Sequence, residues 1–346
     1  DRLAWSQRLS FVPRQWLVWP AGVGWCLLAV FSTVYAGLRP RGEGMPWRSE
    51  RRGRGRVVRV LGRARGVLGV VALVATVHLV VVEWRWPVNL GTAAPAREDR
   101  FRVVYWNVGW SHPVEVMDSL VVREPDLAIV VNPLTRMDLT WDFGVLSEQM
   151  GPAAWERRDW PINVVSRWPV RRWGITQLGF TSSVSVVPEL RSDERPPTDP
   201  GRAMFVEVEV GAPLYRPVVV WILDFPSEPS LHRPAVVRQA LERIAAWLGP
   251  DEQRFPEPDI VIGDLNIPAG SASLDILRRR GGRVLADAHA QGGLGPAPSW
   301  PADRPLLRID QCFIGPGLRA ARYRVEDGGD TRHRMQVVDV VGSGKE

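Results

Sequence analysis

Two long apolar segments without a charged residue constrain the architecture of this chain most strongly. They cover residues 16–38, which number 23, and residues 66–82, which number 17. At 1.5 Å per residue, a helix of about 20 residues crosses a hydrocarbon core about 30 Å thick, so the second segment is at the short end of the range. Trp16 opens the first segment, and Trp84 and Trp86 follow the second, as expected for residues at a bilayer interface. We therefore expect two transmembrane helices; the alternative is a pair of buried core helices.

The segment between them, residues 39–65, carries 10 arginines against Glu43 and Glu50. A short basic loop next to membrane spans stays in the cytoplasm, so the rest of the chain should lie outside it. The basic excess is confined to this region: residues 1–98 hold 15 arginines against 5 acidic residues, whereas residues 99–346 hold 29 basic and 33 acidic residues. A nucleic-acid-binding domain would carry its basic excess on the folded part, so the membrane explanation is preferred.

The sequence predicts three regions. Residues 1–86 form a membrane anchor, residues 87–99 have the composition of a linker, and residues 100–342 form a folded domain. Short apolar runs predict strands at residues 102–107, 127–132, 163–166, 183–187, 204–210, 218–224, 259–263, 308–314, 323–325 and 335–341. Apolar positions at helical spacing predict helices at residues 113–123, 233–248 and 271–280. We therefore expect an α+β domain with two packed sheets and helices outside them.

Several function classes find no support in the sequence. The two cysteines, Cys26 and Cys312, are too few for a disulfide scaffold or a cysteine-rich zinc module. The G-x-S-x-G elbow of serine hydrolases and the phosphate-binding P-loop pattern are both absent from the sequence.

Polar residues that could carry chemistry stand where predicted strands begin or end. They are Asn107, Asn132, Asp224, Asp264, Asn266, Asp310 and His333. Taken singly, an Asp or Asn at a strand end is most often a turn former. Together, converging carboxylates and amides are what a hard divalent cation requires, and a phosphate ester substrate would share that cation. His333 could act as a general base, because the ordinary pKa of histidine lies near neutrality.

The order and spacing of these motifs are more specific than any one of them. The chain runs through Asn107, Asp126 to Asn132, Asn163 to Ser166-Arg167, Gly263-Asp264-Leu265-Asn266, Arg308-Ile309-Asp310 and a final His333. This order resembles the endonuclease/exonuclease/phosphatase superfamily, which has the deoxyribonuclease-I-like fold. The resemblance covers residues 100–342. It implies a four-layer α/β sandwich, with two packed mixed β-sheets flanked by helices, and hydrolysis of phosphodiesters or phosphomonoesters with Mg²⁺ or Mn²⁺.

The resemblance also implies roles for individual residues. Asp264 would orient the nucleophilic water or hold the metal, and Asn107 would support the metal. Asn266 would contact the scissile phosphate. Asp310 would pair with His333, the general base.

The chain departs from the family pattern at three positions. Asn132 stands where the family has a metal-binding Glu, Asp224 where it has a His, and Arg332 where it has an Asp. Asp224 could restore the lost carboxylate, which gives a predicted metal set of Asn107, Asn132, Asp224 and Asp264. Arg332 would join Asn266 at the substrate phosphate, and like-charge repulsion from Arg332 should lower the pKa of His333.

Two functions therefore remain open. The first is a magnesium-dependent phosphoesterase, anchored in a bacterial cell membrane by two helices, that acts outside the cytoplasm. Its substrate would be nucleic acid, a lipid headgroup or a small phosphate ester, and nothing in the sequence requires an obligate protein partner. The second is a degenerate relative that binds a phosphate ligand or serves as a scaffold without hydrolysis.

Overall fold

The computed structural model describes residues 93–109, 113–133, 143–159, 161–181 and 199–344, with isolated positions at 67–77, 89, 183 and 185. The chain divides into two compact units, of which Val12–Val88 is one. The first predicted apolar segment, residues 16–38, lies outside the described residues, and the described positions of the second are helical. Within the described positions, the structure contains no helix with the length and hydropathy of a membrane span.

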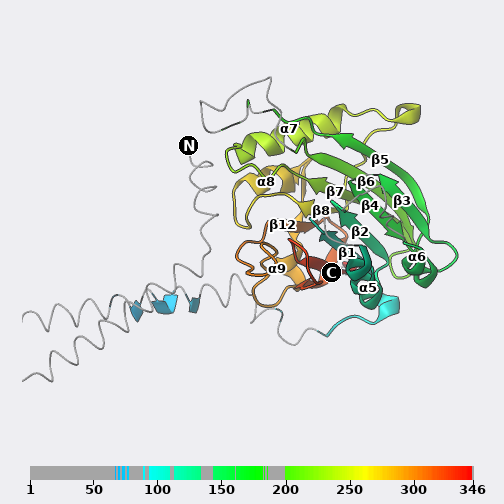
Figure 1. Cartoon of the computed structure of the whole chain (residues 1–346), viewed down its shortest axis with the longest axis horizontal. Coiled ribbons are helices and arrows are strands. Elements are labelled where there is room, and N and C mark those ends of the chain that lie inside the picture. The colour runs from blue at the N-terminus through cyan, green and yellow to red at the C-terminus, as the bar shows by residue number, and fades with distance from the viewer. Residues whose placement is uncertain are drawn as a thin grey trace, which may run out of the picture. The chain divides into compact units, whose positions relative to one another are not determined.

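The larger unit contains two six-stranded mixed sheets (Figure 1). The first sheet has the order β13-β14-β1-β2-β4-β3, with bounds β13 Leu318–Glu326, β14 Met335–Gly342, β1 Phe101–Asn107, β2 Leu127–Val131, β4 Ile162–Ser166 and β3 Trp155–Asp159. The second has the order β11-β12-β8-β7-β6-β5, with bounds β11 Ala286–Asp287, β12 Asp310–Ile314, β8 Ile260–Asp264, β7 Arg216–Asp224, β6 Arg202–Val210 and β5 Val170–Gln177. A small separate ribbon pairs β9 (Arg279–Arg280) with β10 (Arg283–Val284).

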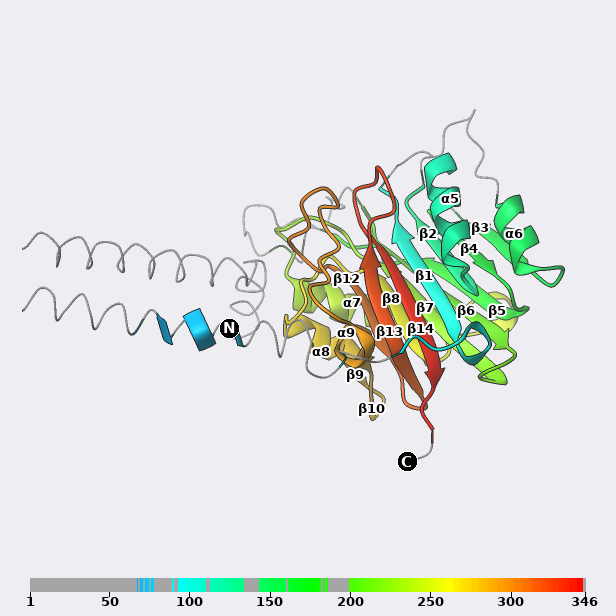
Figure 2. The ribbon, with the colours of Figure 1, turned by 90° about the horizontal axis from the view of Figure 1, so that it is seen from below.

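The apolar side chains of these elements form three layers of core. The central layer lies between the sheets and includes Val103 and Ile129 of the first and Val220 and Ile262 of the second. Helices α5 (Pro113–Arg123) and α6 (Gly144–Met150) cover the outer face of the first sheet, and α7 (Arg233–Ala246) and α8 (Ser273–Arg278) cover that of the second (Figures 1 and 2). A fifth helix, α9 (Ala288–Gly292), lies against β13. The predicted α+β sandwich of two packed mixed sheets flanked by helices is thus confirmed for this unit.

Five strands were not predicted: the two-residue strands β9, β10 and β11, and the longer strands β3 and β5, which lie at sheet edges. β3 and β5 read WERRD and VRRWGITQ, so they lack the apolar run that marks the central strands. An edge strand pairs on one side only and tolerates charged residues that face solvent. Of the predicted strand at residues 183–187, the structure describes only positions 183 and 185, where Ser185 forms an isolated bridge with Leu231.

The pairing of β1 with β14 determines which end of the domain holds the first and last strand termini. The two strands are antiparallel, with Phe101 opposite Val340 and Tyr105 opposite Gln336. The chain therefore enters and leaves the domain at the same end of these strands. Asn107 and the segment that carries His333 lie at the opposite end.

Candidate active site

The two-residue period of each strand explains why the polar residues at the strand ends meet. Val103 and Tyr105 of β1 point into the core between the sheets, so Asn107, two residues further on, points the same way. In β7, Ile222 belongs to this core and Asp224 follows it by two residues.

Strand register then places three carboxylates in one row. Asp224 of β7 is opposite Asp264 of β8, and Asp264 is opposite Asp310 of β12. The residues are buried, with exposed fractions of 1%, 3% and 0% respectively. Three adjacent acidic residues face the end of the first sheet, from which Asn107 comes.

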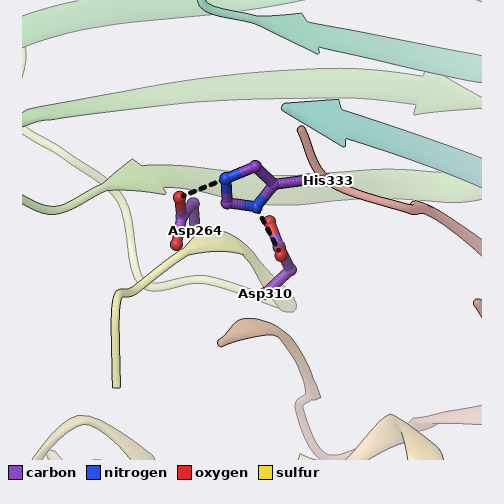
Figure 3. A group of neighbouring side chains, drawn as sticks. All are labelled: Asp264, Asp310 and His333. Atoms are coloured by element: carbon purple, nitrogen blue, oxygen red, sulfur yellow. Dashed lines mark hydrogen bonds and ion pairs between the residues drawn. The ribbon is translucent and has the colours of Figure 1, made fainter. Parts of the chain in front are cut away.

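His333 lies next to two carboxylates of this row, Asp264 and Asp310 (Figure 3). Its Nδ1 is 2.9 Å from Oδ2 of Asp310, and its Nε2 is 3.7 Å from Oδ2 of Asp264. The backbone carbonyl of His333 accepts hydrogen bonds from Nε1 of Trp106, at 2.9 Å, and from the hydroxyl of Thr331, at 2.7 Å. The predicted pairing of Asp310 with His333 is present. Asp264, Asp310 and His333 also form a buried cluster that could hold a metal ion.

Two amides complete the network on the other side of Asp264. Nδ2 of Asn107 donates to Oδ2 of Asp264 at 2.9 Å. Asn132 turns out of β2 with a φ of 55°, and its Nδ2 donates to Oδ1 of Asn107 at 3.3 Å and to Oδ2 of Asp224 at 3.4 Å. The four predicted metal ligands therefore lie in one connected cluster, although Asn132 presents its amide nitrogen to its two partners.

The two predicted phosphate contacts lie at the margin of this cluster. Asn266 has a φ of 48°, its backbone N–H donates to Oδ1 of Asp264 at 3.0 Å, and its Nδ2 donates to the carbonyl of Phe225 at 2.7 Å. Arg332 is exposed and directly precedes the buried His333. Asn266 is thus fixed beside Asp264, whereas Arg332 faces solvent.

Burial and mutual repulsion shift the pKa values of the carboxylates. Burial and the charge of Asp310 raise the pKa of Asp264 to about 6, against the opposing effect of His333. Burial and the charges of Asp199 and Asp264 raise the pKa of Asp224 well above its usual range. The site therefore concentrates negative charge that its own residues do not fully neutralise.

The pKa of His333 shifts in the direction opposite to the one predicted. Burial lowers it, but the charges of Asp310 and Asp264 outweigh burial and raise the pKa to about 9. The prediction of a lowered pKa for His333 was wrong, because the charges of the two nearby carboxylates dominate. Arg332, the residue expected to lower it, is exposed.

In the full-length chain treated with EDTA, His333 should titrate with a pKa of about 9. Asp310→Asn should bring this pKa down toward the ordinary value, because it removes the carboxylate nearest to Nδ1. Histidine ring signals followed by NMR between pH 5 and 10 measure both values, and the signal missing in His333→Gln identifies the residue. A pKa at or below about 6.5 in the metal-free wild type would contradict the charge arrangement described here.

The site also includes supporting residues that the sequence did not single out. The Tyr105 hydroxyl accepts the backbone N–H of Asp264 at 2.8 Å, across the two sheets. The Ser299 hydroxyl accepts the backbone N–H groups of Ile309 and Asp310, at 3.3 and 3.2 Å. The alternation of side chains along β1, which points Tyr105 into the core between the sheets, could have indicated the role of Tyr105. No local sequence pattern indicates a role for Ser299.

Two packed mixed sheets with carboxylates, amides and one histidine at a single end define a member of the deoxyribonuclease-I-like phosphoesterase superfamily. Residues 140–333 match the model of the Endonuclease/Exonuclease/phosphatase family. This match covers more than half of the chain, and the chain belongs to that family. A comparison with curated proteins found no match.

Solved structures with a similar fold come from several bacteria. An endonuclease/exonuclease/phosphatase family protein from Bacteroides thetaiotaomicron is 15% identical, with a TM-score of 0.49, over 71% of this chain and 99% of that one. The mannosyl-6-phosphatase Bt3783 of the same species is 15% identical, with a TM-score of 0.48, over 70% and 99%. The beta toxin of Staphylococcus aureus, a structure with bound magnesium ions, is 11% identical, with a TM-score of 0.38, over 69% and 99%.

Proposed function

We propose that this chain is a membrane-anchored phosphoesterase that depends on Mg²⁺ or Mn²⁺ and whose catalytic domain lies outside the cytoplasm. The observation that carries the proposal is the buried row of Asp224, Asp264 and Asp310 facing His333. Buried carboxylates are costly unless they are compensated, so a row of three at the end of a sheet indicates a functional site.

The donor set fits a hard divalent cation. Asp224 and Asp264 offer carboxylate oxygens as ligands. Burial and neighbouring negative charge raise the pKa values of both carboxyl groups, and a bound cation would offset this repulsion. Asn107 and Asn132 could add amide oxygens, so these four residues would hold the ion. A bound Mg²⁺ or Mn²⁺ would neutralise charge on the substrate and polarise a phosphoryl oxygen.

The residues of the chain then have distinct roles. Asp310 holds Nδ1 of His333 and so directs Nε2 toward Asp264. Nε2 is the atom that exchanges a proton with the attacking water or with the substrate, and neutralisation of Asp264 would lower the pKa of the ring and favour the base role. Asp264 orients the water, while Asn266 and Arg332 contact the phosphate.

A second function has specific support. Asn132, Asp224 and Arg332 differ from the family pattern, and Asn132 places an amide nitrogen where a carboxylate ligand is expected. A domain with this site could bind a phosphate ligand without hydrolysing it. Hydrolysis assays with p-nitrophenyl phosphate and its methyl ester, with saturating Mg²⁺ or Mn²⁺ and with EDTA, separate the two functions. Complete inactivity toward both esters would favour the binding domain.

The membrane anchor is supported by the second apolar segment. Its described positions are helical, and Val67, Val70, Leu73, Val74 and Val77 are exposed, as the lipid-facing side of a span would be. Together with the arginine-rich residues 39–65, this supports an integral membrane protein with a cytoplasmic loop and an extracytoplasmic domain.

Cysteine labelling in intact cells should reveal this topology. Gly344→Cys, at an exposed position of the domain, should react with a membrane-impermeant maleimide, and Gly53→Cys in the loop should react only after permeabilisation. The wild-type chain is the control, because it measures the background labelling of the two native cysteines, Cys26 and the buried Cys312. Labelling at position 53 but not at position 344 in intact cells would show the opposite orientation and contradict the proposed topology.

A further inference from the structure

Arg332, which directly precedes His333, is a cation that no other described residue pairs with. It is exposed, and in the described part of the chain its guanidinium forms no ion pair or side-chain hydrogen bond. Arg233 differs in this respect, because it is buried and donates to the carbonyls of Pro226 and Glu228 at 2.6 and 2.8 Å. Arg332 therefore has the free donors that an anionic ligand needs.

The backbone and stem of Arg332 are nevertheless fixed beside the site. Gly109 has a φ of +54°, and a Cβ added there would lie 2.8 Å from Cβ and 3.1 Å from Cδ of Arg332, so the arginine stem lies directly on this glycine. The Gly109 N–H donates to Oδ1 of Asn107 at 3.1 Å. On the other side, the carbonyl of Arg332 accepts the N–H of Ala302 at 2.9 Å. Arg332 thus connects the Asn107 end of β1 to the segment that carries His333.

The charge of the site indicates what this cation does. Asp224, Asp264 and Asp310 would repel a phosphate group, so binding of an anion requires cations at the same place. A terminal phosphate carries about two negative charges above its second pKa of about 6, whereas a phosphodiester carries one. A guanidinium forms two parallel hydrogen bonds to phosphate oxygens, which favours the more highly charged group with three free oxygens.

We propose that Arg332 determines specificity for a terminal, dianionic phosphate, so that the substrate is a phosphomonoester and not a phosphodiester or a nucleic acid. The inference rests on the proposed function and narrows its substrate class. The charge of residues 99–346 independently disfavours nucleic acid as the substrate, because they hold 33 acidic residues against 29 basic ones.

Kinetics on two esters that share a leaving group test this inference in the full-length chain. Wild type should hydrolyse p-nitrophenyl phosphate with a higher kcat/KM than methyl p-nitrophenyl phosphate. Arg332→Ala should lower kcat/KM for the monoester by about 10- to 100-fold and for the diester by less than about threefold. For the monoester, the kcat/KM of Arg332→Lys should lie between those of wild type and Arg332→Ala, since an ammonium keeps the charge but cannot form the two parallel hydrogen bonds of a guanidinium. Arg319→Ala removes an exposed arginine at the other end of β13 and should change neither value.

The outcomes separate this inference from the proposed function. Hydrolysis with a preference for the diester, or an equal loss on both esters in Arg332→Ala, overturns the specificity role and leaves the phosphoesterase in place. If neither ester is hydrolysed, the phosphoesterase fails, and calorimetry with phenylphosphonate and its monomethyl ester in the presence of Mg²⁺ decides the specificity. Tighter binding of the dianion that is lost in Arg332→Ala supports the inference, and equal binding of the two ligands refutes it.

Discussion

His333→Ala is expected to lower kcat by at least about a hundredfold on any phosphate ester that the wild-type chain hydrolyses. The ring is held by Asp310 at Nδ1 and faces Asp264 at Nε2, which is the geometry of a residue that moves a proton during the reaction. Alanine removes the proposed proton carrier, whereas its effect on KM should be small because the proposed phosphate contacts, Arg332 and Asn266, are retained. Steady-state kinetics with saturating Mg²⁺ or Mn²⁺ measures the effect.

His232→Ala is the matched control, because it removes a histidine that precedes α7 and has no proposed role in the reaction. Its kcat should stay within about threefold of wild type, and thermal unfolding should show that both variants fold. Full activity in His333→Ala would exclude the histidine as the proton carrier. Equal inactivity of wild type and His333→Ala would instead favour the binding domain.

Asp224→Ala and Asp264→Ala should each weaken Mg²⁺ binding at least tenfold, which corresponds to about 1.4 kcal/mol, or abolish it. With a neutral residue at position 132, Asp264 is expected to need a second carboxylate, and Asp224 lies opposite it in register, within reach of the Asn132 amide. Calorimetric titration of EDTA-treated full-length chain with Mg²⁺ and Mn²⁺ gives the dissociation constants.

Two further variants sharpen this test. Glu252→Ala removes an exposed carboxylate that lies outside the proposed site, so it should leave the affinity unchanged. Asn132→Glu should strengthen binding, because it adds a charged oxygen ligand beside Asn107. An unaltered affinity in Asp224→Ala would remove Asp224 from the metal site and leave Asp264 as its main carboxylate.

The central strands could be predicted because burial on both faces requires continuous apolar runs. β1, β2, β4, β7, β8, β12 and β14 were located in this way. β3 and β5 could not, because the arginines of an edge strand resemble those of a loop. The helix of residues 144–150 was missed as well, since seven residues are too few for a periodic pattern to stand out.

The site was predictable in its residue types and less so in its electrostatics. Motif order and family resemblance indicated Asp264, Asp310 and His333, which the structure brings together. The pKa of His333 depends on two carboxylates from other strands, and sequence proximity gave undue weight to Arg332. Ser299 supports Asp310 from a separate loop through contacts that depend on the tertiary fold.

The antiparallel pairing of β1 with β14 also determines how the domain can be attached to a surface. Phe101 and Gly342 lie at one end of these strands and Asn107 at the other, so the seven residues of β1 separate the attachment end from the site by about 20 Å at 3.3 Å per residue. A sensor chip or resin coupled behind Gly342 would hold the protein by the end at which Phe101 begins β1. The carboxylate row and His333, at the other end, would then face away from the support.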